Sequence, residues 1–265
     1  MGKITETVKI LLIINVIFYL GSLFILKPDP ATQLFALWFV EHPSFQVWQP
    51  LTHMFMHDLG SPMHIIFNMY GLWMFGSAVE QELGQKKFLF FYFSAGLGAA
   101  LIHTLVNYYH FQSGFTALVE AGWNEDQVLN LLKDAETQIR SLGRYQVDIP
   151  QGFDGELIKS MISSYVTSAS GASGALYGIL VGFGMMYPNA SLGLLFIPVP
   201  IKAKYFIPAL ILLDLFSGLT GFSIFGQNIA NWAHLGGALF GFIMMYYWKK
   251  NSFNDKRWYL SLIHI

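Results

Sequence analysis

Two polar residues stand at the edges of strongly apolar segments, where they could perform nucleophilic catalysis. Ser173, within Gly171-Ala172-Ser173-Gly174, opens an almost wholly apolar run, and His234 lies near the start of the last such run. A serine oxygen attacks a carbonyl once its proton is removed, and an adjacent neutral imidazole can remove it. The chain contains no cysteine, which excludes a thiol nucleophile. The two residues therefore predict a serine nucleophile, Ser173, with His234 as its base.

Glycines indicate how these two residues could meet. They recur every four residues on one face of each segment: Gly174, Gly178 and Gly182 in the first, Gly237 and Gly241 in the last. Small residues at this spacing let helices approach closely in lipid. Tyr177 lies one turn below Ser173, where its ring could stack on the imidazole. The alternative is that the glycines only pack helices, the serine is incidental and the histidine belongs to the core.

A second polar pair, His64 and Asn68, is four residues apart and so projects from one helix face. Acyl transfer needs donors aimed at the developing oxyanion, and both side chains qualify alongside the backbone N–H of Ser173. His53, His57 and His64 also cluster in the sequence, which raises a metal site as the alternative. Because His53-Met-Phe-Met-His57 lacks the glutamate of His-Glu-x-x-His, we expect no zinc protease. We also expect no other metal site and no cofactor.

Asp214 is an acidic residue inside another apolar segment. Ionisable residues in the membrane usually face a bundle interior or a wet cavity. Nothing in the sequence aims Asp214 at His234. We expect it to hydrogen-bond within the bundle or to line a cavity, and we assign it no catalytic role.

The composition indicates a polytopic helical membrane protein. Hydrophobic residues make up 54% of the chain and charged residues only 12%, whereas a soluble domain carries about 25% charged residues. Six stretches qualify as membrane spans: 8–26, 63–82, 88–109, 172–187, 205–220 and 228–248. In lipid the backbone must satisfy its own hydrogen bonds, so we expect helices rather than strands. No small-residue cleavage site follows the first stretch, so we expect it to be retained rather than removed as a signal peptide.

The spans divide one domain into four parts. Residues 1–109 hold the first three spans and an amphipathic, aromatic outer loop at 27–62, which we expect at the lipid headgroups. Residues 110–167 form a hydrophilic insert, 168–250 hold the last three spans, and 251–265 form a cytoplasmic tail.

The insert has helix signals of its own. Asn124 and Gln127 resemble a capping box, followed by apolar residues at helical spacing up to Gly143, and Asp154 could cap a second helix. We therefore expect a small extramembrane helical unit. It is either a lid or recognition module, or an insertion without a catalytic role.

The basic residues predict the orientation. On one side of the spans lie Lys3, Lys9, Lys86, Lys87, Lys202, Lys204, Lys249, Lys250, Lys256 and Arg257, and on the other lie Lys27, Lys133, Arg140, Arg144 and Lys159. Short cytoplasmic segments carry the excess of Lys and Arg, so we expect both termini in the cytoplasm and the insert on the outer side. The basic residues are scattered at span ends, which gives no surface for nucleic acid.

Taken together, the motifs resemble those of rhomboid intramembrane serine proteases. The matching segments are His64-Ile-Ile-Phe-Asn68 followed by Gly76 and Glu80, Gly171-Ala-Ser173-Gly174-Ala-Leu-Tyr177-Gly, and Ala233-His234-Leu-Gly-Gly237-Ala-Leu-Phe-Gly241. The resemblance extends from Trp48 onward, apart from the insert at 110–167.

The resemblance implies an all-α bundle of six transmembrane helices, whose short fourth helix begins within the membrane at the serine. It implies a Ser173–His234 dyad without a carboxylate and an oxyanion site that includes His64 and Asn68. Tyr177 would stack under His234. Two residues, Gly171 and Asn231, would support the site.

The chain departs from the family pattern at two places. Many members carry Trp-Arg in the first outer loop, where this chain has Trp48-Gln49, so the structural role of that arginine is absent or replaced. Bacterial members usually have a short connection before the serine helix, whereas the insert at 110–167 is long.

These observations predict a multi-pass protein of the inner cell membrane that cuts peptide bonds in or beside a transmembrane helix. Its partners would be membrane lipid and single-pass membrane protein substrates, without nucleic acid or metal. One alternative is a non-catalytic rhomboid-like binder of transmembrane helices. Another is a solute transporter, which would show two repeat halves with broken helices, and the sequence has no such internal symmetry.

Overall fold

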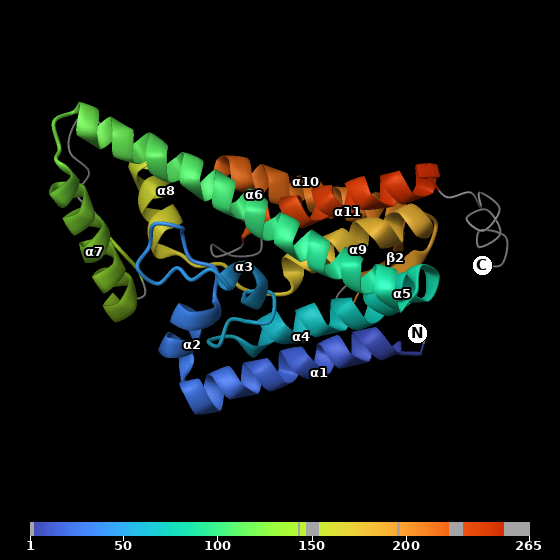
Figure 1. Ribbon diagram of the computed structural model, residues 1–265. Coiled ribbons are helices and arrows are strands. Elements are labelled where there is room, and N and C mark those ends of the chain that lie inside the picture. Colours follow the sequence, from blue (N-terminus) through green and yellow to red (C-terminus); the bar gives the residue numbers. More distant parts are fainter. Residues whose placement is uncertain (1–2, 143, 147–153, 195–196, 223–229, 252–265) are drawn as a thin grey trace.

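The computed structural model describes residues 3–142, 144–146, 154–194, 197–222 and 230–251. Long helices run side by side and make up most of the molecule (Figure 1). The helical elements are α1 (Glu6–Gly21), the π-helical η1 (Ser22–Leu26), α2 (Pro28–Phe35), α3 (Gln49–Thr52), α4 (Pro62–Gly71), the π-helical η2 (Leu72–Gly76), α5 (Ser77–Leu83), α6 (Gln85–Glu120), α7 (Glu125–Leu142), α8 (Gly155–Val166), α9 (Ser173–Met186), α10 (Ala203–Thr220) and α11 (Asn231–Asn251). The all-α polytopic membrane fold predicted from the sequence is confirmed.

Three of the predicted spans correspond to helices that are long and apolar enough to cross a membrane: Glu6–Leu26, Gln85–Glu120 and Ala203–Thr220. The predicted span at 172–187 is α9, which is equally apolar but has only 14 residues. The predicted span 63–82 corresponds to the consecutive elements α4, η2 and α5, and the predicted span 228–248 corresponds to α11.

The serine helix α9 is the most buried element, and its glycines bring it against α11. A Cβ built on Gly178 would lie 2.5 Å from the Cβ of Ala95 on α6 and 3.0 Å from the carbonyl oxygen of Gly237 on α11. A Cβ on Gly241 would lie 2.6 Å from the Cα of Gly178. The backbones of α9 and α11 therefore touch, which confirms the close approach that the glycine spacing predicts.

A carboxylate fastens α1 to the rest of the bundle. Glu80 on α5 accepts hydrogen bonds from the backbone N–H groups of Thr7, at 3.1 Å, and Val8, at 3.0 Å, and from the hydroxyl of Thr5. These N–H groups belong to the first turn of α1, where a helix leaves donors unsatisfied and favours negative charge. Glu80 thus caps α1 from another element.

The outer loop between α1 and α4 supports the segment that leads to the serine. Leu37 and Ala169 pair as an isolated antiparallel bridge, with N–H to O distances of 2.8 and 2.9 Å. Gln49 is completely buried, and its side chain joins separate parts of this loop. Its Oε1 accepts from the N–H of Trp38, and its Nε2 donates to the carbonyls of Gln33 and Ser44. Where many family members have an arginine after the tryptophan, the Gln49 amide therefore cross-links the outer loop in this chain.

The insert is a helical unit built on an extension of α6. That helix continues to Glu120, beyond the predicted span end at 109. Asn124 and Gln127 exchange two hydrogen bonds of 2.9 Å, so the predicted capping box is confirmed. Asp154 accepts from the N–H of Glu156 at the start of α8, as predicted. The predicted stop at Gly143 and almost all of the predicted tail at 251–265 lie outside the described residues.

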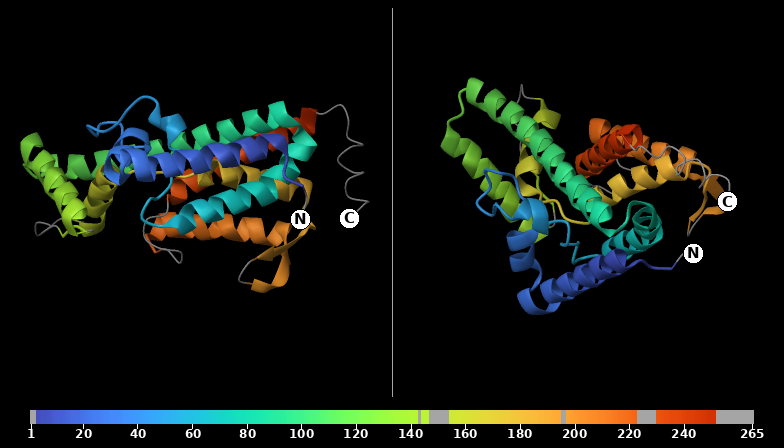
Figure 2. Two further views of the ribbon diagram at one scale, coloured as in Figure 1. Left: turned by 90° about the horizontal axis from the view of Figure 1, so that it is seen from below. Right: turned by 45° about the vertical axis from the view of Figure 1, so that its right-hand side comes forward.

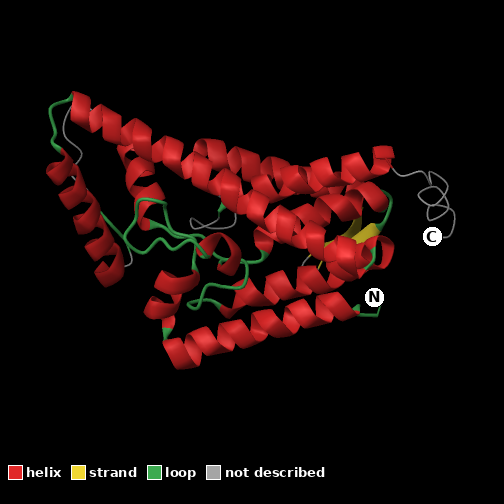
Figure 3. Ribbon diagram, in the orientation of Figure 1, coloured by secondary structure: helices red, strands yellow, loops and turns green. Residues whose placement is uncertain are grey.

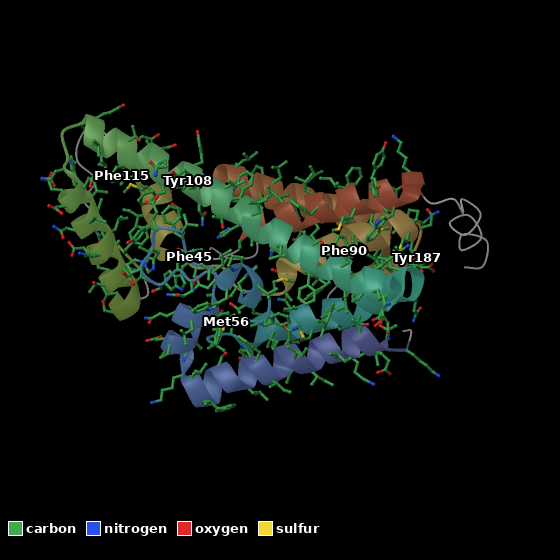
Figure 4. All side chains as sticks on the ribbon, in the orientation of Figure 1. Phe45, Met56, Phe90, Tyr108, Phe115 and Tyr187 are labelled. Atoms are coloured by element: carbon green, nitrogen blue, oxygen red, sulfur yellow. The ribbon has the colours of Figure 1, made fainter. Side chains whose placement is uncertain are left out.

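A separate apolar core holds this insert against α6 and the outer loop. It consists of Phe39, Phe111, Leu118, Val128, Leu132, Ala135, Ile158, Met161, Ile162, Tyr165 and Val166. Figure 4 labels Phe115 on the far part of α6, and its ring packs against the same core. The insert is therefore anchored rather than loosely tethered.

A β-hairpin is an element that the sequence did not predict. Strands β1 (Ser191–Leu194) and β2 (Ile197–Lys202) pair antiparallel and are the strands drawn in yellow in Figure 3. The hairpin projects from the bundle near α5 and far from the insert (Figure 2). Just before it, the hydroxyl of Tyr187, labelled in Figure 4, donates to Glu82 on α5 at 2.6 Å.

Candidate active site

Ser173 is the first residue of α9, and the chain before it is held on both sides. Ala169 pairs with the outer loop, and the N–H of Gly171 donates to the carbonyl of His53 at 2.9 Å. The first N–H groups of a helix have no partner within it, so they remain available at the serine. The serine thus stands at a fixed helix N-terminus with backbone donors beside it.

His234 on α11 contacts Ser173 directly. Its Nε2 lies 2.8 Å from the serine Oγ, within hydrogen-bond distance. The ring of Tyr177 stacks on the imidazole with centroids 4.2 Å apart and an interplanar angle of 10°. The structure therefore brings together Ser173, His234 and Tyr177, and both the hydrogen bond and the stack constrain the imidazole ring.

The other ring nitrogen of His234 faces a carboxylate. Its Nδ1 lies 3.2 Å from Oδ2 of Asp214 on α10. From the sequence we assign Asp214 no catalytic role, and the resemblance implies a dyad without a carboxylate, so this contact differs from the expectation. The side chains are 12% and 8% exposed, which shows that the contact is well shielded by protein.

A signal for Asp214 exists in the spacing of residues on two neighbouring helices. Asp214 and Ser217 are three residues apart on α10, and Asn231 and His234 are three apart on α11. Asn231 Nδ2 donates to Ser217 Oγ at 3.0 Å, one helical turn from the Asp214–His234 contact. Antiparallel packing of two such faces pairs both sets, but the rotation of α10 that permits it depends on tertiary packing.

His64 on α4 faces the same small space as the serine. Its Nδ1 accepts from the N–H of Asp58 at 3.1 Å, so a neutral ring carries its proton on Nε2. A Cβ built on Gly171 would lie 2.9 Å from that Nε2 and 3.5 Å from Ser173 Oγ. Gly171 has a φ of 123°, which residues with a side chain rarely adopt. The N–H of His64 therefore points into the space beside the serine.

Asn68 is buried one turn along α4, but the structure engages its amide locally. Its Nδ2 donates to the carbonyl of His64 at 2.8 Å, and Oδ1 has no hydrogen-bond partner among the described residues. One amide hydrogen remains after this bond.

Two further histidines surround the site and stay neutral. Burial lowers the pKa of His53 to about 4, and burial together with the nearby His64 lowers the pKa of His57 to about 3. The rings of His57 and His64 meet edge to face with centroids 5.3 Å apart. Over the described ranges, no three His, Cys, Asp or Glu residues converge in a way that could hold a metal ion.

Chemically, the arrangement provides a hydroxyl, an imidazole within reach of it and a carboxylate behind the imidazole. His64 Nε2 and the helix N-terminus supply N–H groups on the adjacent side. Such an arrangement suits acyl transfer, in which a hydroxyl attacks a carbonyl and N–H donors stabilise the oxyanion.

Comparison with known proteins identifies relatives for most of the chain. The Rhomboid domain matches residues 44–122 and 133–251, which include every site residue described above. Presenilin-associated rhomboid-like protein A, mitochondrial, of Danio rerio is 28% identical over 205 residues, covering 75% of this chain and 39% of the relative. Rhomboid protease GlpG of Salmonella newport is 49% identical over 45 residues, covering 17% of this chain and 16% of the relative. The chain thus spans well under half the length of these relatives.

Proposed function

The chain belongs to the rhomboid family, and on this premise we propose that it is an intramembrane serine endopeptidase. Membership of this family supports an intramembrane protease-type function in general. The observation that carries the proposal of serine catalysis is the 2.8 Å separation between His234 Nε2 and Ser173 Oγ. A histidine placed so has the geometry of a general base toward a serine.

In the proposed reaction, Ser173 attacks the carbonyl carbon of the scissile peptide bond while its proton passes to His234 Nε2. The tetrahedral oxyanion accepts hydrogen bonds from His64 Nε2–H and the backbone N–H of Ser173, with the free amide hydrogen of Asn68 as a third donor. His234 then returns the proton to the leaving amine. A water molecule, activated by the same imidazole, attacks the acyl-enzyme and releases the second product.

The proposed substrates are single-pass membrane proteins in contact with the same lipid. A peptide bond inside a regular helix is shielded by its own turn, so the substrate must present a locally unwound segment. We place the protein in the inner cell membrane with both termini cytoplasmic and the insert outside, on the distribution of Lys and Arg. Water for deacylation then enters from the outer face.

A fluorophosphonate probe and a reporter transmembrane substrate test the proposal in detergent. Wild type should react with the probe and cut the reporter, Ser173→Ala should do neither, and His234→Ala should lose at least about 10²-fold in rate. Ser77 is a matched control, since it is a buried serine on α5 whose Oγ has no hydrogen-bond partner within the described part of the chain. Ser77→Ala should react like wild type.

An unlabelled wild type that leaves the reporter uncut contradicts the protease proposal. Retention of the intact reporter by such a protein would favour the alternative, a non-catalytic binder of transmembrane helices. Labelling of Ser173→Ala at the wild-type rate would show that another residue is the nucleophile.

A further inference from the structure

We infer that Asp214 is a positioning residue that fixes the tautomer and orientation of His234, which extends the serine–histidine pair to a serine–histidine–aspartate arrangement. The inference rests on the proposed serine protease function. Its starting observation is the contact between Asp214 Oδ2 and His234 Nδ1, 3.2 Å apart and on the opposite side of the ring from Ser173.

The chemistry of the imidazole gives this contact a direction. A neutral imidazole carries one proton, and only the tautomer with a bare Nε2 can take the proton of Ser173. An ionised carboxylate has no proton to donate, so it can only accept from Nδ1–H. Asp214 therefore selects the tautomer in which Nε2 is free to act as base, and its negative charge stabilises the imidazolium that forms when the serine proton arrives.

The basic partner of Asp214 is His234. Among the described residues, His234 is the only cationic or imidazole group within ion-pair distance of the carboxylate. The Tyr177 hydroxyl is a second polar neighbour, and its ring stacks on the same imidazole. A buried carboxylate in a membrane segment is costly unless it is paired. His234 and Tyr177 both belong to the site, so these interactions of Asp214 hold the imidazole.

A second polar contact between the same helices fixes the register of α10. Asn231 on α11 donates to Ser217 on α10 at 3.0 Å, one turn from the Asp214–His234 contact. Because both contacts join α10 to α11, a loss of packing alone would affect them alike. Ser217 therefore offers a control that weakens the helix pair without touching the imidazole.

The experiment compares Asp214→Asn, Asp214→Ala and Ser217→Ala with wild type, using reporter cleavage, fluorophosphonate labelling and thermal unfolding in detergent. The asparagine is nearly isosteric, but its amide can donate to Nδ1 and so favour the tautomer whose Nε2 is already protonated. We expect kcat for Asp214→Asn to fall about 10²-fold with KM within threefold of wild type. The kcat of Asp214→Ala should be no lower than that of Asp214→Asn, whereas the kcat of Ser217→Ala should stay within threefold of wild type.

A measurement without turnover complements the kinetics. Nitrogen-15 NMR of labelled histidine in detergent micelles reports the tautomer of His234, which should be protonated at Nδ1 in wild type and shift toward Nε2 protonation in Asp214→Asn. Cleavage by Asp214→Asn within threefold of wild type, or an unchanged tautomer, would overturn the inference while the protease proposal stands. If wild type neither labels nor cleaves, the protease proposal fails, and the tautomer alone decides whether Asp214 positions His234.

Discussion

Gly171 links the position of Ser173, the proposed nucleophile, to that of His64. Its φ of 123° turns the chain into α9, and the place a side chain would occupy lies between His64 Nε2 and Ser173 Oγ. The absence of a Cβ there keeps open the space in which a substrate carbonyl would have to sit. The residue is needed both for its backbone conformation and for its lack of a side chain.

Gly171→Ala should therefore reduce activity more than stability. The strained φ costs about 1–3 kcal/mol, while the new methyl, 2.9 Å from His64 Nε2, blocks the carbonyl site and lowers the cleavage rate about 10²-fold. Gly122 provides the control, since it has a φ of 94° and no described residue places an atom within 4 Å of its Cβ position. Gly122→Ala should show a similar loss in unfolding midpoint and wild-type cleavage, and an equal loss of cleavage in both variants would contradict this account.

Single residues differ in how far their roles can be predicted from sequence. Ser173 and His234 could be paired because glycine spacing on their own segments signals close approach. Asp214 could not be placed, since its contact with His234 depends on how α10 is rotated about its axis. In the sequence, Gln49 is only a departure from the family's Trp-Arg pattern, and its three hydrogen bonds within the outer loop depend on contacts that no periodicity encodes.

At the level of elements, the site depends on the contact between α9 and α11. These helices approach through glycines, so the hydrogen bond between Ser173 and His234 requires the backbones to touch. A Cβ on Gly237 would overlap the carbonyl group of Gly174, one residue after the serine. No rotamer can relieve this overlap, because the obstacle is backbone.

Gly237→Ala should separate the two helices and disable the site. We expect a loss of about 3 kcal/mol or more in the free energy of unfolding, together with loss of fluorophosphonate labelling. For Gly21, in α1, no atom of the residues that the structure describes lies within 4 Å of its Cβ position. Gly21→Ala should be neutral or raise stability by up to about 1 kcal/mol, because alanine favours the helix. Normal labelling by Gly237→Ala would show that the glycine contact is not what brings the pair together.

Elements with local signals were predicted well, and elements that depend on distant contacts were not. The capping box at Asn124 and the cap at Asp154 are encoded within three residues, and both are present. The hairpin of β1 and β2 escaped prediction because its strands are short and follow an apolar helix. The π-helical turns η1 and η2 lie inside apolar segments whose composition does not distinguish them from α-helix.

At the level of the whole molecule, the insert is continuous with the site. The chain passes from α8 through the bridge at Ala169 to Gly171 and Ser173, while Phe39 of the outer loop is buried in the core of the insert. The insert, the outer loop and the segment before the serine are therefore packed as one unit. This unit lies at the opposite end of the bundle from the start of α1 (Figure 1).

The length of α6 determines where that unit stands relative to the membrane. With 36 residues, the helix is about 54 Å long at about 1.5 Å per residue. A hydrocarbon core is about 30 Å thick, so we expect α6 to project beyond it. Because the insert packs on the far part of α6, we expect that projecting part to carry it out of the lipid.

This geometry and the distribution of Lys and Arg together predict the topology, and the absence of cysteine from the chain makes it directly testable. Lys86 and Glu120 are exposed residues near the two ends of α6. In cells producing the protein, a membrane-impermeant maleimide should label Glu120→Cys in intact cells. It should label Lys86→Cys only after the membrane is permeabilised. The cysteine-free parent supplies a blank background, and the activity of each variant on the reporter confirms that it is folded. The reverse labelling pattern would invert the proposed orientation, and labelling of both positions in intact cells would mean that α6 does not cross the membrane.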